Sequence, residues 1–175
     1  MKRIASLIIA LVAGLSAIPS ARAEDPAKTD TEEITDLKQV VAAVPHEVLV
    51  GLLSNAGKQV AASKSSDFLR QKIEGRTATL KLKIERVEKD PRPNQAQDGY
   101  RLKADETPVR EGGASFKSIL WVHFQADESE KIAKMKTGEE IKVTGTITQA
   151  FIRAQRFLVL DVEISGATGH AVDSH

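Results

Sequence analysis

Arginine, lysine, tryptophan and histidine side chains recur at two-residue spacing in two segments of the sequence. Arg101 and Lys103 lie in one segment, and Trp121 and His123 lie in the other. Residues two apart in a β-strand point to the same side of a sheet, so each pair shares one face. Cationic side chains attract anions such as phosphate, and an indole ring can stack on a base or sugar ring for about 1 to 3 kcal/mol. The four side chains are therefore candidates for a ligand-binding face.

Arg153 and Arg156 are candidates for the rim of the same face. They lie in or beside a stretch at residues 149–155 that the sequence predicts as a loop. A pair of arginines there could contact an anionic group. Arg92, in a second predicted loop at residues 88–99, would add another cation. The alternative interpretation is that Arg153 and Arg156 are solvated side chains at a hairpin tip.

Trp121 also has an alternative interpretation. It is the only tryptophan, and aromatic residues make up 4% of the chain, so it could be a core anchor beneath N-terminal helices. The segment at residues 118–124 is apolar on both faces, which predicts that it is covered on both sides. The second cover is either those helices or a ligand.

The other polar residues do not form a recognisable catalytic or metal-binding arrangement. The sequence has no cysteine, no Gly-x-Ser-x-Gly elbow and no phosphate-binding glycine loop. Asp161 and Glu163 share a strand face, as acidic residues on an exposed face ordinarily do. His170, Asp173 and His175 have a spacing that a metal could use, but they lie in a polar, Gly-rich tail. We therefore expect a non-enzymatic protein without a cofactor or metal site.

The first 23 residues have the pattern of a secretory signal peptide. Lys2 and Arg3 precede an apolar stretch at residues 4–18, and Ala21-Arg22-Ala23 is a small-x-small cleavage site. Cleavage before Glu24 would leave 152 of the 175 residues, enough for one domain with its own core. The signal has a bacterial form, and no later stretch is apolar enough to span a membrane. We expect a periplasmic or secreted protein with no stable membrane insertion after cleavage.

Removal of this segment changes the net charge. The whole chain has 25 basic and 24 acidic residues, a formal charge of +1. Without Lys2, Arg3 and Arg22 there are 22 basic and 24 acidic residues, a formal charge of −2. Proteins that hold nucleic acid through its phosphates usually have a basic excess, which this composition lacks.

Residues 24–73 divide into a leader and a helical segment. Residues 24–33 are polar and aperiodic, which predicts a flexible leader. Residues 34–73 carry apolar residues at helical spacing, interrupted by Pro45. We interpret this segment as a layer over one side of a barrel, and the alternative is a partner-binding helix.

From Gly75 onward apolar and polar residues alternate, which predicts β-strands. Val87 falls out of phase, as a β-bulge would cause. Gly145 takes an inward position, where a missing side chain favours a bend or the close approach of another backbone. A helix is predicted at residues 127–136 and a disordered tail at residues 167–175. The predicted strands span residues 75–87, 100–104, 118–124, 141–147 and 158–164.

These segments together resemble the OB-fold, in particular the exported bacterial domains of the tRNA-anticodon-binding-like OB family. The resemblance is carried by residues 75–87 and 119–124, by Lys136-Thr-Gly-Glu-Glu-Ile-Lys-Val-Thr-Gly and by residues 158–164. It covers residues 74–166. It implies a mainly β protein with N-terminal helices, in which a five-stranded OB-fold barrel has a helix between strands three and four. Known OB-folds bind ligands on the face of strands two and three.

The resulting prediction is a non-enzymatic, exported OB-fold module that binds a protein or a cell-envelope glycan. The alternative prediction is a single-stranded oligonucleotide-binding protein. The predicted ligand-binding residues are Arg101, Lys103, Trp121, His123, Arg153 and Arg156.

Overall fold

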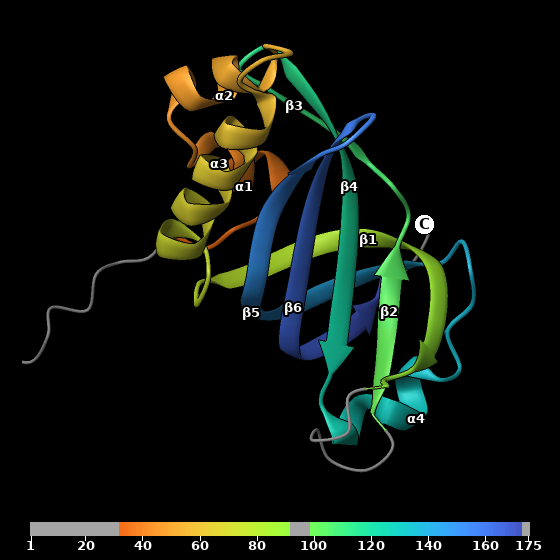
Figure 1. The fold of residues 1–175 in the computed structure, drawn as a ribbon. Helices are drawn as coiled ribbons and strands as arrows, with labels where there is room; N and C mark the ends of the chain where they lie inside the picture. The colour runs from red at the N-terminus through yellow and green to blue at the C-terminus, as the bar shows by residue number, and fades with distance from the viewer. Residues whose placement is uncertain (1–31, 92–98, 173–175) are drawn as a thin grey trace, which may run out of the picture. The chain divides into compact units, whose positions relative to one another are not determined.

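The computed structural model describes residues 32–91 and 99–172, in which N-terminal helices precede a β-barrel (Figure 1). The helical elements are α1 (Leu37–Ala42), α2 (His46–Leu52), α3 (Lys58–Lys72), η1 (Ala126–Glu128) and α4 (Ser129–Ile132). The strands are β1 (Thr77–Lys89), β2 (Tyr100–Ala104), β3 (Pro108–Glu111), β4 (Ala114–Phe124), β5 (Glu140–Ala154) and β6 (Leu158–Ala171). The predicted signal peptide and nearly all of the predicted leader lie outside the described residues, as do Arg92, Asp173 and His175.

Five of the strands in the described part of the chain close into a ring. Neighbours pair in the order β1, β2, β4, β6 and β5, and β5 pairs again with β1. The pairing of β4 with β6 is parallel and the other pairings in the ring are antiparallel. The short helix α4 lies between β4 and β5, the third and fourth strands of the ring. The predicted fold class, a five-stranded OB-fold barrel with N-terminal helices, is confirmed.

Gly145 allows β5 to pair on both of its edges where the barrel curves. A Cβ atom at this position would lie 2.6 Å from Ile164 Cγ2 and 3.1 Å from Ala167 Cα. The register between β5 and β6 shifts between Thr144 and Thr146, which marks a bulge at the glycine. The predicted role of Gly145 as a site of close backbone approach is confirmed.

The predicted bulge in the first strand is also present. The register between β1 and β2 shifts between Ile84 and Arg86, just before Val87. The slip in the hydrophobic pattern therefore had a physical cause, since an extra residue in one strand changes which face the following side chains occupy.

Strands β5 and β6 are longer than predicted. The expected loop at residues 149–155 is strand as far as Ala154, and residues 167–171 of the expected disordered tail belong to β6. Ala167 is fully buried, and a Cβ atom at Gly169 would lie 2.6 Å from Ile141 Cδ1. Small residues in this part of β6 thus face a crowded interior. Because they lack large apolar side chains, the hydrophobic pattern did not reveal the strand.

Two other segments were not predicted as the structure shows them. Gly112 and Gly113 form the turn of a hairpin between β3 and β4, with φ angles of 57° and 80°, and β3 was not among the predicted strands. Positive φ at successive turn positions favours glycine. The expected helix at residues 127–136 ends at Ile132, and Met135 N–H donates to the Ile132 carbonyl three residues back, as in a tighter 3₁₀-type turn.

Ile34 is not part of a helix, although its spacing predicted one. It forms a parallel β-bridge with Ala78, in which the Ile34 N–H donates to the Thr77 carbonyl at 3.0 Å. Helix α1 begins later because Asp36 caps it, with its side chain accepting from Lys38 N–H.

Side chains from α3 and the turn after it satisfy the backbone of β5 where no strand lies beside it. The pairing of β1 with β5 ends at Thr146. Beyond that point Ala150 N–H donates to Glu74 Oε1 at 3.1 Å, and Ile152 N–H donates to Ser66 Oγ at 3.1 Å. Further along, the side-chain amide of Gln59 donates to the Ala154 carbonyl at 2.6 Å. An uncovered strand edge invites pairing with another chain, so α3 acts as an edge cover.

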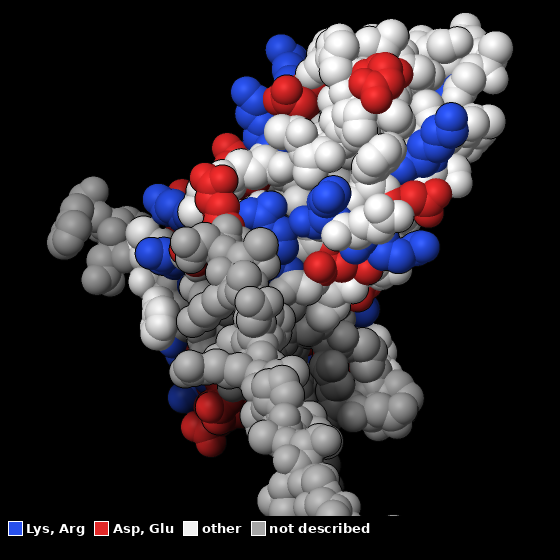
Figure 2. All heavy atoms as spheres, turned by 90° about the vertical axis from the view of Figure 1, so that its left-hand side faces the viewer, with Lys and Arg blue, Asp and Glu red and all other residues white. Residues whose placement is uncertain are grey.

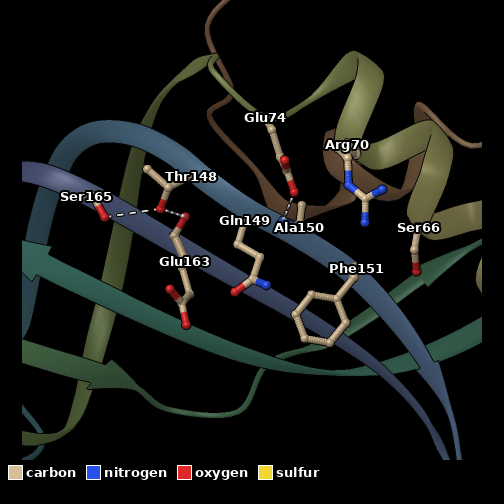
Figure 3. A pocket seen from close by; sticks show the side chains of 9 residues that line it. All are labelled: Ser66, Arg70, Glu74, Thr148, Gln149, Ala150, Phe151, Glu163 and Ser165. Atoms are coloured by element: carbon tan, nitrogen blue, oxygen red, sulfur yellow. Dashed lines mark hydrogen bonds between the residues drawn. The ribbon is translucent and has the colours of Figure 1, made fainter. Parts of the chain in front are cut away.

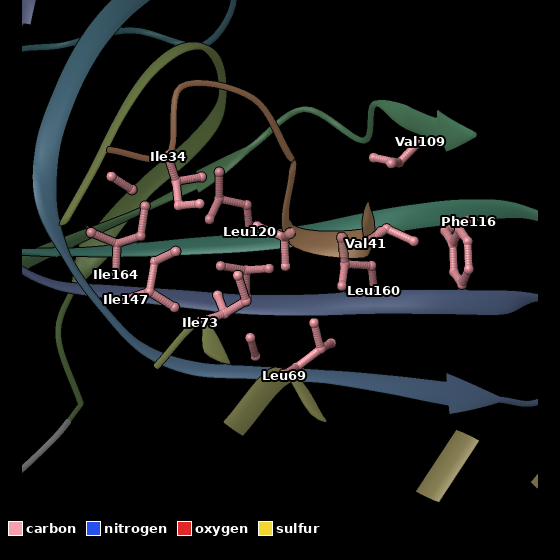
Figure 4. Close-up of a cluster of buried hydrophobic side chains, with 14 of the residues drawn as sticks. Ile34, Val41, Leu69, Ile73, Val109, Phe116, Leu120, Ile147, Leu160 and Ile164 are labelled. Atoms are coloured by element: carbon pink, nitrogen blue, oxygen red, sulfur yellow. The ribbon is translucent and has the colours of Figure 1, made fainter. Parts of the chain in front are cut away.

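The helices and the barrel share one hydrophobic core (Figure 4). Val41 from α1, Leu69 from α3 and Ile73 after it lie in one cluster with Leu120 of β4 and Leu160 of β6. All five are at most 2% exposed. Burial of each such side chain contributes about 1.5 to 3 kcal/mol, so this packing holds the helical segment on the barrel. The arrangement agrees with its interpretation as a layer on the barrel.

Replacement of Ser66 by alanine should destabilise the protein by roughly 1 to 3 kcal/mol, because Ile152 N–H would lose its acceptor in a buried position. Urea unfolding followed by circular dichroism measures this change. Ser63→Ala, at an exposed position of the same helix, is the matched control and should change the free energy of unfolding by less than about 0.5 kcal/mol. Equal effects of the two variants would show that the edge bond contributes nothing.

Candidate functional site

Trp121 lies on the outer face of the barrel, in β4. Its neighbours Leu120 and Val122 are buried in the core, whereas Trp121 is half-buried. The guanidinium carbon of Arg101 is 4.1 Å from the centroid of the indole ring, and that of Arg86 is 5.1 Å from it. Both distances are in the range of cation–π attraction. The indole is therefore associated with two cationic side chains.

The N-terminal helices make their main contacts elsewhere on the barrel. Helix α1 contacts β3, α2 contacts β4 and α3 contacts β5. The contact of α2 is at the start of β4, where Leu49 lies beside Gly112. Trp121 is near the other end of β4 and pairs with Lys103 of β2. The interpretation of Trp121 as a core anchor beneath the helices does not hold.

Carboxylates lie close to each cation around Trp121. Lys103 Nζ is 2.6 Å from Glu85 Oε2, and Arg101 Nε donates to Glu88 Oε1 at 2.7 Å. Arg86 Nε is 3.4 Å from Glu88 Oε2. Such partly exposed pairs contribute little to stability. Their effect is to offset the positive charge of this face locally.

His123 is buried, unlike its neighbours on the predicted face. It is 2% exposed, and its Nδ1 lies 2.6 Å from Asp90 Oδ2 while its Nε2 lies 3.8 Å from Glu163 Oε2. The register between β4 and β6 shifts between Val122 and Phe124, so the strand is irregular at His123. His123 therefore lies between Asp90, just after the end of β1, and Glu163 of β6, and it is not exposed to a ligand.

Arg153 and Arg156 have different environments. Arg153 makes two hydrogen bonds to Asp161, at 2.6 Å and 2.8 Å, and this bonding raises the pKa of Arg153. Arg156 is exposed at the turn between β5 and β6 and lies 5.5 Å from the ring of Phe157. Lys117 Nζ is 5.2 Å from the same ring, and Phe157 is 53% exposed. The structure thus separates the two arginines, which the sequence analysis treated as a pair.

Arg86 and Phe157 were not among the residues predicted for the site. The bulge before Val87 decides which way Arg86 points, and a pattern that loses its phase cannot assign a face. Phe157 gave no periodic signal because it lies in a turn. Its position next to Arg156 in the sequence was the one signal that could have indicated a contact between the ring and a cation.

A groove of about 660 Å3 lies between α3 and the outer side of β5 and β6 (Figure 3). Figure 3 shows the side chains of Gln149, Phe151 and Glu163 projecting to the same side of the strands, with Arg70 extending toward them from the helix. Gln149 and Glu163 are directly paired across β5 and β6. Glu163 is in turn paired with Trp121 across β6 and β4, so the groove adjoins the outer face.

Charges of both signs are interspersed on the side of the molecule that carries the helices (Figure 2). The upper end of that view is largely uncharged. In the described residues, no helix is long and apolar enough to cross a membrane. The same residues contain no group of three or more histidine, aspartate or glutamate side chains placed to hold a metal ion.

No family model and no curated protein sequence matches the chain. Solved structures resemble it at low similarity. The Plasmodium falciparum SSB complex with ssDNA has a TM-score of 0.35 and 12% identity, over 55% of this chain and 94% of that chain. The S. pombe Stn1-ten1 complex has a TM-score of 0.33 and 13% identity, over 56% and 59%. Aspartyl tRNA synthetase from Entamoeba histolytica has a TM-score of 0.36 and 11% identity, over 99% and 29%.

The chain thus spans less than two thirds of two of these three structures. The OB-fold follows from the strand order and pairing of the chain itself. The prediction of a protein or cell-envelope glycan partner is corrected here, since ssDNA is the ligand that accompanies the SSB neighbour.

Proposed function

We propose that the chain binds single-stranded nucleic acid on the outer face formed by Arg86, Arg101, Lys103 and Trp121, called here the Trp121 face. The observation that carries the proposal is the half-exposed indole with two guanidinium groups beside its ring. Unstacked bases stack on aromatic rings and on arginine planes, and the same arginines can contact phosphates. The face thus offers both interactions that a single strand requires.

Phosphates would compete with Glu85 and Glu88 for the three cations of the Trp121 face. Each cation that changes partner exchanges one anion for another, so the gain in charge attraction is partly cancelled. Three phosphate contacts give a dependence of log K on log salt of about −2 for a single strand. We expect modest affinity that falls moderately with salt.

We also propose that this binding takes place outside the cytoplasm and without catalysis. The signal-like segment at residues 1–23 supports a periplasmic or secreted location. The sequence resemblance described above supports an exported bacterial domain of the tRNA-anticodon-binding-like OB family. The cations around Trp121 are paired with carboxylates, at 3.4 Å for Arg86 and Glu88 and 2.6 Å for Lys103 and Glu85, which supports a binding role for this surface.

Arg101→Gln should weaken binding of a single-stranded oligonucleotide by roughly tenfold, because it removes a phosphate contact and a stacking plane. The magnitude of the salt slope should fall by about 0.7. Fluorescence anisotropy of a labelled oligonucleotide measures both quantities. Arg110→Gln, which removes the same charge from an exposed position of β3, is the control and should retain the affinity. Unmeasurable binding by the unaltered protein at low salt would refute the proposal.

Glu88→Gln should strengthen oligonucleotide binding by roughly three- to tenfold, because it releases Arg86 and Arg101 from a shared carboxylate. Glu130→Gln causes the same change in net charge at an exposed position between β4 and β5, and it should have a much smaller effect. If both substitutions raise the affinity equally, net charge rather than the local exchange of partners is responsible.

Export with signal cleavage predicts a mature chain that begins at Glu24. Expression of the full chain in a bacterial host, followed by intact-mass measurement of the periplasmic fraction, tests this. A chain that keeps residues 1–23 and stays in the cytoplasm would contradict the proposed location, while leaving the Trp121 face unaffected.

A further inference from the structure

We propose that the groove between α3 and β5 is a base-binding subsite that prefers guanine. This inference rests on the proposed binding of single-stranded nucleic acid. The groove lies outside the Trp121 face, across β6 from it, and it exists because α3 covers the edge of β5.

The groove is continuous with the Trp121 face through one row of paired residues. Gln149 of β5 pairs with Glu163 of β6, Glu163 pairs with Trp121 of β4, and Trp121 pairs with Lys103 of β2. Adjacent strands are about 4.8 Å apart, so about 10 Å separates the backbone at Gln149 from that at Trp121. A short oligonucleotide that stacks on Trp121 can therefore place another base in the groove.

Glu163 and Gln149 present a hydrogen-bonding pattern that selects among bases. An ionised carboxylate is acceptor-only, and a side-chain amide can donate two hydrogen bonds. The Watson–Crick edge of guanine has two adjacent donors, N1–H and N2–H, beside the acceptor O6. Glu163 can accept from the two donors while the Gln149 amide donates to O6. Thymine has a single donor between two acceptors and would leave one carboxylate oxygen without a partner.

Glu163 is available for this role. Its side chain is 37% exposed, and its Oε2 lies 3.8 Å from Nε2 of His123, beyond hydrogen-bonding distance. In contrast, the other acid on the helix side, Glu74, already accepts a hydrogen bond from Ala150 N–H. Glu74 therefore stabilises the fold, whereas the Glu163 carboxylate can accept hydrogen bonds from a ligand.

Phe151 and Arg70 complete the subsite. Phe151 lies two residues from Gln149 on the same strand, is partly exposed and offers its ring for stacking with the base. Arg70 extends toward it from α3, and its contact with Asp67 is an exposed pair at 3.7 Å that a phosphate can replace. The helix therefore supplies a phosphate contact and the strands supply base recognition.

The test compares oligonucleotides of about 12 nucleotides, within the site size of one OB-fold. One probe is all thymidine, and the others carry a single central dG, dA or dC. The unaltered protein should bind the dG probe about tenfold more tightly than the thymidine probe, with dA and dC between them. Glu163→Gln should reduce this ratio to about three or less. Arg70→Gln should weaken binding of the dG probe more than that of the thymidine probe.

Asp161→Asn is the matched control. It removes the same charge from the next outward position of β6 but lies outside the groove, where it bonds to Arg153. It should change the affinity for all probes in parallel and keep the preference for dG. Thermal unfolding checks that each variant is folded.

The outcomes separate this inference from the proposed function. Failure of the unaltered protein to bind any probe at low salt would remove both. Binding of all probes with equal affinity, or a preference for dG that survives Glu163→Gln, would overturn the guanine subsite and leave the Trp121 face in place.

Discussion

The barrel depends on the close approach of two backbones at Gly145. There β5 must bend enough to pair with β1 on one edge and with β6 on the other, and Ile164 and Ala167 leave no room for a side chain. Ile164 and Ala167 also pair with Val122 and Phe124 of β4, so the bend lies close to the end of the strand that carries Trp121. A larger residue at this position would have to displace core side chains, and interiors packed at protein density resist such displacement.

The groove lies just beyond this bend. Strand β1 begins at Thr77, which pairs with Thr146, so the remainder of β5 has an edge without a neighbouring strand. Helix α3 takes that place, but a helix is wider than a strand and cannot lie as close to the outer side chains of β5. The space between them is the groove that Arg70 and Phe151 line. Covering the edge and forming the subsite are therefore two results of one packing arrangement.

Sequence patterns predicted the barrel well because large side chains alternate where strands face a core. Gly145 and the phase slip at Val87 even located the bend and one bulge. The patterns failed at Ala167 and Gly169, where small residues occupy the crowded interior.

The candidate site was less predictable, for related reasons. The sequence of a strand that is apolar on both faces does not indicate what covers its second face, so the surroundings of Trp121 could not be predicted. Arg86 was hidden by the bulge, and His123, which shares the spacing of Trp121, is buried beside Asp90. The hydrogen bonds between α3 and β5 join residues more than 70 positions apart, for which the sequence gives no signal.

Those hydrogen bonds have a consequence for how the surface can change. Each of them reaches the main chain of β5, so helix docking does not depend on which side chains β5 turns outward. Residues 149, 151 and 153 can therefore be substituted, in evolution or by design, while the hydrogen bonds between α3 and β5 are retained. Ligand preference thus depends on side-chain atoms of β5, whereas docking of the helix depends on main-chain atoms of the same strand.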